Sequence, residues 1–68
     1  MMIEVHINGE PKQLATTCSV ADMLVHLNIK SRAIAIECNG EIVTRENYPV
    51  RLLKAGDQIE VVTLAGGG

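Results

Sequence analysis

The chain has 68 residues, enough for one domain, and 47% of them are apolar, which favours a folded core over disorder. The net charge of −2 and the single aromatic residue, Tyr48, provide neither a basic stripe for phosphates nor rings to stack on bases, so nucleic-acid binding is disfavoured. No apolar run approaches the roughly 20 residues of a membrane span, and no signal peptide is visible, so we expect a cytoplasmic protein that does not bind membranes.

The chain opens with a predicted β-hairpin. Apolar and polar residues alternate over residues 3–7, the pattern of a half-buried strand. Asn8-Gly9 follows, the preferred pair for a two-residue hairpin turn because both residues tolerate positive φ. We expect the return strand to include residues 13–15.

A short amphipathic helix is predicted next. Ser19 suits the N-cap position, and Asp22 lies three residues later, as in a capping box. An apolar stripe at helical spacing would face a sheet; it consists of Val20, Met23, Leu24 and Leu27. Asn28 is expected to close the helix, and Ile29 to fold back onto the core.

Two further strands are predicted around a second Asn-Gly turn. Residues 33–38 form the first, with Ile34 and Ile36 facing inward. The turn at positions 39–40 leads to a short strand over residues 41–43. This pair is therefore expected to be antiparallel.

The last part of the predicted domain ends in a strand. Residues 44–54 contain Pro49 and have mixed polarity, so we expect a loop or a short turn of helix. Gly56-Asp57 is typical of a turn, and residues 59–64 form the closing strand. The order β-β-α-β-β-β allows the first and last strands to lie together in the centre of a mixed sheet of about five strands on one helix. That arrangement is the α+β fold called β-grasp, or ubiquitin-like.

The chain ends in three glycines. We expect residues 1–64 to form the β-grasp domain and residues 65–68 a flexible reactive tail that includes Gly66, Gly67 and Gly68. Glycine has no side chain to pack and loses the most entropy on ordering, so stabilisation does not explain this segment. A thin, extended tail can instead enter a narrow tunnel. The alternative is a frayed terminus or an expression scar without function.

The carboxylate of Gly68 predicts acyl-transfer chemistry. A carboxylate is a poor acyl donor, but its reaction with ATP gives an acyl-adenylate from which AMP leaves easily. Attack by sulfide or a persulfide then gives a thiocarboxylate. We therefore predict a sulfur carrier rather than an enzyme, with Gly68 as its reactive residue and no cofactor bound by the chain itself.

Several segments carry a resemblance to a known family. They read Ser-Val-Ala-Asp-Met-Leu at 19–24, Ala-Ile-Glu-Cys-Asn-Gly-Glu-Ile-Val-Thr-Arg-Glu at 35–46 and Ala-Gly-Asp-Gln-Ile-Glu-Val-Val at 55–62. Together with the first hairpin and the glycine tail, these segments resemble the ThiS family of sulfur carriers, which serve thiazole formation in thiamine biosynthesis. Val-Pro-Arg is usual in that family at positions 43–45, where this chain has Val-Thr-Arg, a departure that bears on loop conformation and not on the tail.

The resemblance implies three partners. The first is an E1-like adenylating enzyme that binds the ATP. The second is a thiazole synthase that receives the sulfur, and the third is a sulfur donor, such as a cysteine desulfurase or an equivalent.

A docking patch is predicted beside the tail. If Ile59 faces the core, strand alternation places Val62 and Leu64 on the outer face of the sheet together with Ala35. Such a patch would suit docking to the partners, and scattered surface apolar residues are the alternative.

The other chemically active side chains have simpler interpretations. Cys18 and Cys38 match no zinc spacing and are expected to be small, partly buried hydrophobic residues rather than redox or metal-binding groups, so we predict no metal site. His6 and His26 are expected to be ordinary surface histidines.

Three alternatives to this function stay open. One is the carrier of molybdopterin synthesis, which shares the fold and a Gly-Gly end but is generally longer. Another is a ubiquitin-like interaction module without tail chemistry. An independent enzyme is the weakest alternative, because no nucleophile lies beside a base in the sequence.

Overall fold

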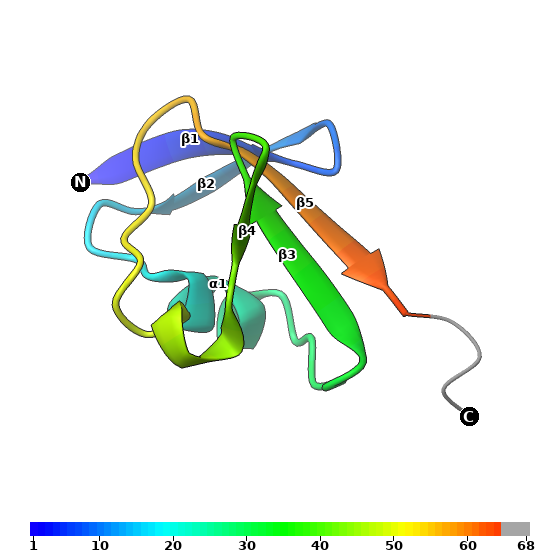
Figure 1. The fold of residues 1–68 in the computed structure, drawn as a ribbon. Coiled ribbons are helices and arrows are strands. Elements are labelled where there is room, and N and C mark those ends of the chain that lie inside the picture. The colour runs from blue at the N-terminus through cyan, green and yellow to red at the C-terminus, as the bar shows by residue number, and fades with distance from the viewer. Residues whose placement is uncertain (65–68) are drawn as a thin grey trace.

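The computed structural model describes residues 1–64, in which five strands form one mixed sheet and a short α-helix packs against one of its faces (Figure 1). The elements are β1 (Met2–Ile7), β2 (Glu10–Ala15), α1 (Val20–His26), β3 (Ile34–Cys38), β4 (Glu41–Val43), the 3₁₀ helix η1 (Arg45–Asn47) and β5 (Gln58–Thr63). The predicted order of elements is confirmed. No helix within residues 1–64 has both the length and the apolar character needed to cross a membrane.

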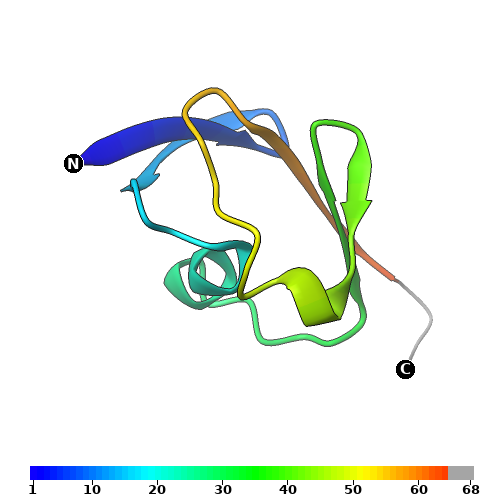
Figure 2. The ribbon, with the colours of Figure 1, turned by 60° about the vertical axis from the view of Figure 1, so that its left-hand side comes forward.

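The sheet has the strand order β2-β1-β5-β3-β4. β1 and β5 are parallel neighbours at its centre, and the β1–β2, β3–β4 and β3–β5 pairs are antiparallel. Seen from a second side, α1 lies below the sheet and the 3₁₀ helix below β4 (Figure 2). The predicted β-grasp topology, with the first and last strands side by side, is confirmed.

Both Asn-Gly pairs form the turns that the sequence predicts. Asn8 and Gly9 have φ values of 52° and 84°, and Asn39 and Gly40 have values of 54° and 83°. Two successive positive φ values are the mark of a type I′ turn, whose twist matches that of the flanking strands. The turn also fixes the register of β1 with β2, which is why β2 begins at Glu10, earlier than its mostly polar sequence indicates.

Hydrogen bonds close both ends of α1. The Asp22 N–H donates to Ser19 Oγ and the Ser19 N–H donates to Asp22 Oδ2, both at 3.1 Å, so the predicted capping box is confirmed. At the other end Asn28 has a φ of 60°, and the Ile29 N–H donates to the Leu24 carbonyl at 2.9 Å. This is a Schellman ending with asparagine in the left-handed position. Ile29, predicted to fold back onto the core, is only half-buried and is not among the described side chains that pack against the core cluster.

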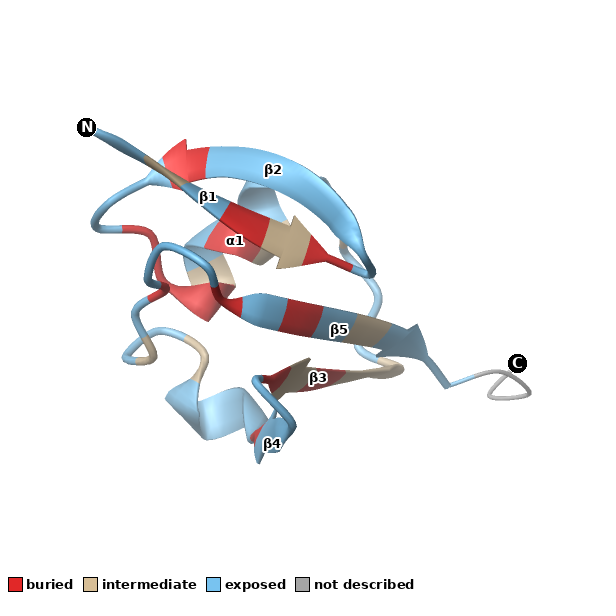
Figure 3. Cartoon of the chain, turned by 90° about the horizontal axis from the view of Figure 1, so that it is seen from above, coloured by how far each residue is buried: buried red, intermediate tan, exposed pale blue. Residues whose placement is uncertain are grey.

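The core lies between α1 and the sheet (Figure 3). Its fully buried side chains are Val5, Val20, Met23, Ile36, Cys38 and Ile59. Leu24, predicted to be buried by the sheet, is only partly buried and packs at the margin of this cluster. A helix of seven residues has a narrow contact face, and Val20 and Met23 occupy its centre.

The segment between β4 and β5 crosses the molecule beside the N-terminus of α1. The Leu53 N–H donates to the Cys18 carbonyl at 2.9 Å, and the Leu53 side chain is buried. The 3₁₀ helix confirms the expected turn of helix. The strand bounds differ slightly from the sequence prediction: β3 begins at Ile34 rather than Ala33, and β5 ends at Thr63 rather than Leu64.

We expect Met23→Ala to lower the free energy of unfolding by about 2–5 kcal/mol, because it removes a fully buried side chain and leaves a cavity. That is a large share of the stability of a small domain. Val25 lies on the same helix with 80% of its surface exposed, so Val25→Ala is the matched control and should change stability by less than about 0.5 kcal/mol. Urea denaturation followed by circular dichroism measures both. Equal losses in the two variants would contradict the observed facing of α1.

Candidate functional site

The end of β5 carries the predicted docking residues. Val62 and Ala35 are direct partners in the β5–β3 register, and Val62 is 48% exposed. Leu64 is 52% exposed just beyond the strand, and its N–H donates to the Ala33 carbonyl at 2.7 Å. Ile59 is fully buried, so alternation along β5 places Val61 on the inner face of the sheet and Val62 on the outer face. Val62, Leu64 and Ala35, here called the outer patch, therefore lie together on the face of the sheet opposite α1.

The reactive residues predicted from the sequence, Gly66, Gly67 and Gly68, lie outside the described residues. The same holds for the predicted tail as a whole, residues 65–68. Leu64 is the last residue that the structure describes. The outer patch therefore ends at the residue directly before the predicted tail in sequence.

Two carboxylates border the outer patch. Glu37 and Glu60 are direct partners in the β3–β5 register, and strand alternation places both on the outer face. Like charges in directly opposite positions disfavour the sheet, so this pair does not serve stability. The surface at the outer patch therefore combines apolar side chains with negative charge.

The start of β5 is fixed by a network around Asp57. Asp57 is buried, and its Oδ2 accepts a hydrogen bond from the Lys54 N–H at 2.8 Å. Its Oδ1 accepts one from Asn39 Nδ2 at 3.0 Å, and Asn39 Oδ1 accepts one from the Gln58 N–H at 2.9 Å. The structural role predicted for the Gly56-Asp57 turn is confirmed. The contribution of Asn39 is missing from the sequence prediction, because its partners lie 18 and 19 residues away.

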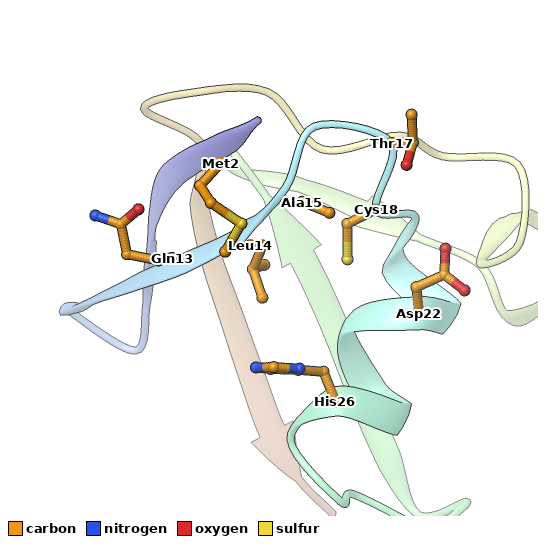
Figure 4. A pocket seen from close by; sticks show the side chains of 8 residues that line it. All are labelled: Met2, Gln13, Leu14, Ala15, Thr17, Cys18, Asp22 and His26. Atoms are coloured by element: carbon orange, nitrogen blue, oxygen red, sulfur yellow. The ribbon is translucent and has the colours of Figure 1, made fainter.

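Cys18 lines a pocket of about 320 Å³ between β2 and α1, with Leu14 and His26 nearby (Figure 4). Burial raises the pKa of the Cys18 thiol, and the Asp22 carboxylate raises it further. The thiol also donates a long hydrogen bond of 3.4 Å to the Ser19 carbonyl. A protonated, buried thiol is a poor nucleophile, so this group is not set up for sulfur chemistry.

Cys38 is fully buried beside β5. Burial raises the pKa of its thiol, the Asp57 carboxylate raises it further, and the Arg51 guanidinium acts in the opposite direction. Arg51 Nη2 donates to Cys38 Sγ at 3.3 Å. Both cysteines are free thiols within the core, as expected from the sequence. Among the described residues, no three histidine, cysteine, aspartate or glutamate side chains lie together as metal ligands.

The histidines lie apart from one another. His26 is exposed on α1, as predicted, whereas His6 is half-buried on the outer face of β1. His6 Nδ1 lies 3.3 Å from Gln58 Nε2 across the β1–β5 pair. His26 lines the same pocket as Cys18, whose thiol donates to the Ser19 carbonyl and not to the imidazole.

Comparison with known proteins gives one consistent family. The model of the ThiS family matches residues 5–68, which include the glycine tail. A sulfur carrier protein ThiS from Thermus thermophilus is 33% identical over 64 residues, covering 94% of this chain and 98% of that protein. A thiazole synthase from Paramagnetospirillum magneticum is 37% identical over 62 residues. That match covers 91% of this chain but only 19% of the synthase, so this chain spans about a fifth of that relative.

The fold agrees with a solved structure of the same family. The crystal structure of the thiamine biosynthesis protein ThiS from Geobacter metallireducens superposes with a TM-score of 0.84 and 29% sequence identity. The match covers 97% of this chain and all of that one.

We expect both cysteine thiols to react slowly with a chromogenic disulfide reagent at pH 7 in the folded protein and rapidly in urea. The reason is that both are buried and have raised pKa values. Reaction of both thiols with the reagent within the mixing time, in the absence of denaturant, would contradict this expectation.

The same pKa shifts make stability depend on alkaline pH. A thiol whose pKa is raised by folding keeps its proton longer in the folded state than in the unfolded state. The contribution of this shift to the free energy of unfolding is present in full below the pKa of the thiol in the unfolded state, about 8.5. It is lost as the pH rises through the higher pKa of the thiol in the folded state. The urea midpoint should therefore fall above about pH 8.5, and the fall should be shallower in Cys18→Ala.

Proposed function

This chain belongs to the ThiS family, and we propose that it is a sulfur carrier of thiamine biosynthesis, acted on by partner enzymes and not itself a catalyst. The main support for this proposal is the family match, which includes the glycine tail as far as residue 68. The fold of the described residues agrees with that family. The outer patch beside the last strand supports it.

The reacting group in this proposal is the carboxylate of Gly68. A carboxylate oxygen attacks the α-phosphorus of ATP, pyrophosphate leaves, and the product is an acyl-adenylate. Hydrosulfide attacks the carbonyl carbon, the bond to AMP breaks, AMP leaves with its electron pair, and a thiocarboxylate remains. If an enzyme persulfide attacks instead, AMP leaves in the same way and the product is an acyl disulfide, and a thiol then reduces its S–S bond to release the thiocarboxylate. The ATP is bound by an E1-like adenylating enzyme, so the carrier needs no cofactor of its own.

The globular domain supplies recognition in this scheme. Three glycines offer few features for an enzyme to recognise, whereas the outer patch provides apolar contact area next to them. Glu37 and Glu60 add negative charge beside it. We therefore expect the adenylating enzyme to present an apolar contact surface with basic residues at its rim, since complementary charge favours correct encounters.

The sulfur acceptor is inferred from the relatives. Polypeptides named thiazole synthase contain a segment similar to this chain, so we propose a thiazole synthase as the enzyme that takes sulfur from the thiocarboxylate. A cysteine desulfurase or an equivalent enzyme would supply the sulfur. A molybdopterin-type carrier is the alternative, and the ThiS family match favours the thiamine pathway.

Deleting Gly68 should abolish adenylation while the unfolding midpoint changes little. The shortened tail still ends in a carboxylate, but that group lies about 3.5 Å short of the ATP, the length of one extended residue. Glycine has no side chain to pack, so its loss should cost the fold little. ATP-dependent pyrophosphate release with an adenylating enzyme that acts on ThiS proteins measures the first effect, and thermal unfolding the second. A truncated carrier that reacts at the normal rate would refute the role of Gly68.

Val62→Asp should weaken binding of the adenylating enzyme by at least tenfold, because it would bury an unpaired charge in the interface. The free carrier should lose little stability, since Val62 is 48% exposed and the new carboxylate would stay in water. Val25→Asp places the same charge on α1, away from the outer patch, and should leave affinity unchanged. Calorimetric titration provides the affinities. Equal affinity of Val62→Asp and wild type would place the docking surface elsewhere on the domain.

A further inference from the structure

The side chain of Asn8 contacts Val61, in the second half of β5. Asn8 Oδ1 accepts a hydrogen bond from the Val61 N–H at 2.8 Å, and Asn8 Nδ2 donates to the Val61 carbonyl at 3.3 Å. A carboxamide has the same donor and acceptor as a peptide group. The side chain therefore pairs with Val61 as the backbone of a neighbouring strand would.

This contact comes at the point where backbone pairing with β1 ends. The parallel ladder consists of His6 with Gln58 and Ile7 with Ile59, and the Asn8 N–H then donates to the Ile59 carbonyl at 2.8 Å. The chain reverses immediately afterwards, so β1 has no main-chain group left for Val61. On its other side β5 continues to pair with β3 as far as Thr63. Within residues 1–64, Asn8 is thus the last hydrogen-bond partner of β5 on the β1 side.

The second hairpin contains a matching residue. Asn39 occupies the same turn position, with a φ of 54° against 52° for Asn8. Its side chain bonds the Gln58 N–H and Asp57, at the start of β5. The two asparagines therefore bind different parts of one strand: Asn39 binds its start, and Asn8 binds its second half on the side that faces β1.

We propose that Asn8 is a positioning residue for sulfur transfer, a role that rests on the proposed function. By binding Val61 it holds the second half of β5 on the side that faces β1, while β3 holds the other side, so that Val62 and Leu64 of the outer patch keep a fixed position relative to the rest of the domain. A docked carrier must place its terminal carboxylate in the partner's ATP site. If only a fraction of molecules hold the outer patch in that position, the apparent affinity falls to that fraction of its full value, while the chemistry in the correctly docked complex is unchanged.

The test compares Asn8→Gly with Asn39→Gly. Glycine adopts positive φ without strain, so each variant keeps its turn and loses only the carboxamide contacts. Pyrophosphate release is measured with ATP, a purified adenylating enzyme that acts on ThiS proteins, and varied carrier concentration. We expect Asn8→Gly to raise the KM for the carrier about fivefold or more and to leave kcat unchanged. An increase of this size in KM corresponds to the loss of two exposed hydrogen bonds. Asn39→Gly should leave both constants unchanged, even where it lowers the unfolding midpoint more.

Amide hydrogen exchange provides a readout that needs no enzyme. The Val61 amide, which donates to Asn8 Oδ1, should exchange faster in Asn8→Gly and not in Asn39→Gly. Equal KM values for wild type and Asn8→Gly, or equal increases in both variants, would overturn the role of Asn8 and leave the proposed function standing. If wild-type carrier releases no pyrophosphate, the proposed function fails and the positioning role falls with it.

Discussion

The parallel pairing of β1 with β5 is the interaction on which the rest of this structure depends. It joins segments about 50 residues apart in sequence, and closing so long a loop costs entropy that only the buried core can offset. Val5 and Ile7 from β1 and Ile59 from β5 bring apolar side chains to the same face, where α1 covers them. Once this pairing forms, β2 and β3 each have a fixed neighbour, and the order of the whole sheet follows.

The central position of β5 also gives the strand two separate roles. Its inward residues, Ile59 and Val61, belong to the core, so the strand is held firmly. Its outward residues, Glu60 and Val62, are exposed and lie outside that core, and Val62 belongs to the docking surface proposed above. Because a strand alternates its side chains between two faces, one segment can anchor the fold and present a docking surface without conflict.

The buried thiols fit a protein in which the globular domain does not carry the sulfur. Cys18 and Cys38 lie in the core with raised pKa values, and Asp22 and Asp57 beside them are committed to hydrogen bonds of the backbone. Such thiols resist oxidation and unwanted exchange with persulfides, since the thiolate is the reactive form. In the proposed function the chemistry takes place at the terminal carboxylate, and the domain supplies a stable body that partner enzymes recognise.

The features that the sequence by itself determined are those set by residues close together in the chain. Both Asn-Gly turns, the Ser19–Asp22 capping box and the alternation along β5 depend on neighbours within about four positions, so local pattern was sufficient. The β-grasp order followed from these elements. The glycine tail is also a matter of sequence, and the assignment of its chemistry rests on sequence and family.

Only the tertiary structure decided which side chains meet across the sheet. Asn8 reaches Val61 over 53 positions, and Asn39 reaches Asp57 over 18, although both residues look like simple turn formers in the sequence. Leu24 fits the helix stripe but lies at the margin of the core, because burial depends on where a short helix crosses the sheet. Local patterns fix the conformation of a segment and the faces it presents. What each face contacts is set by packing between segments distant in sequence, and this information does not lie in any one stretch of the chain.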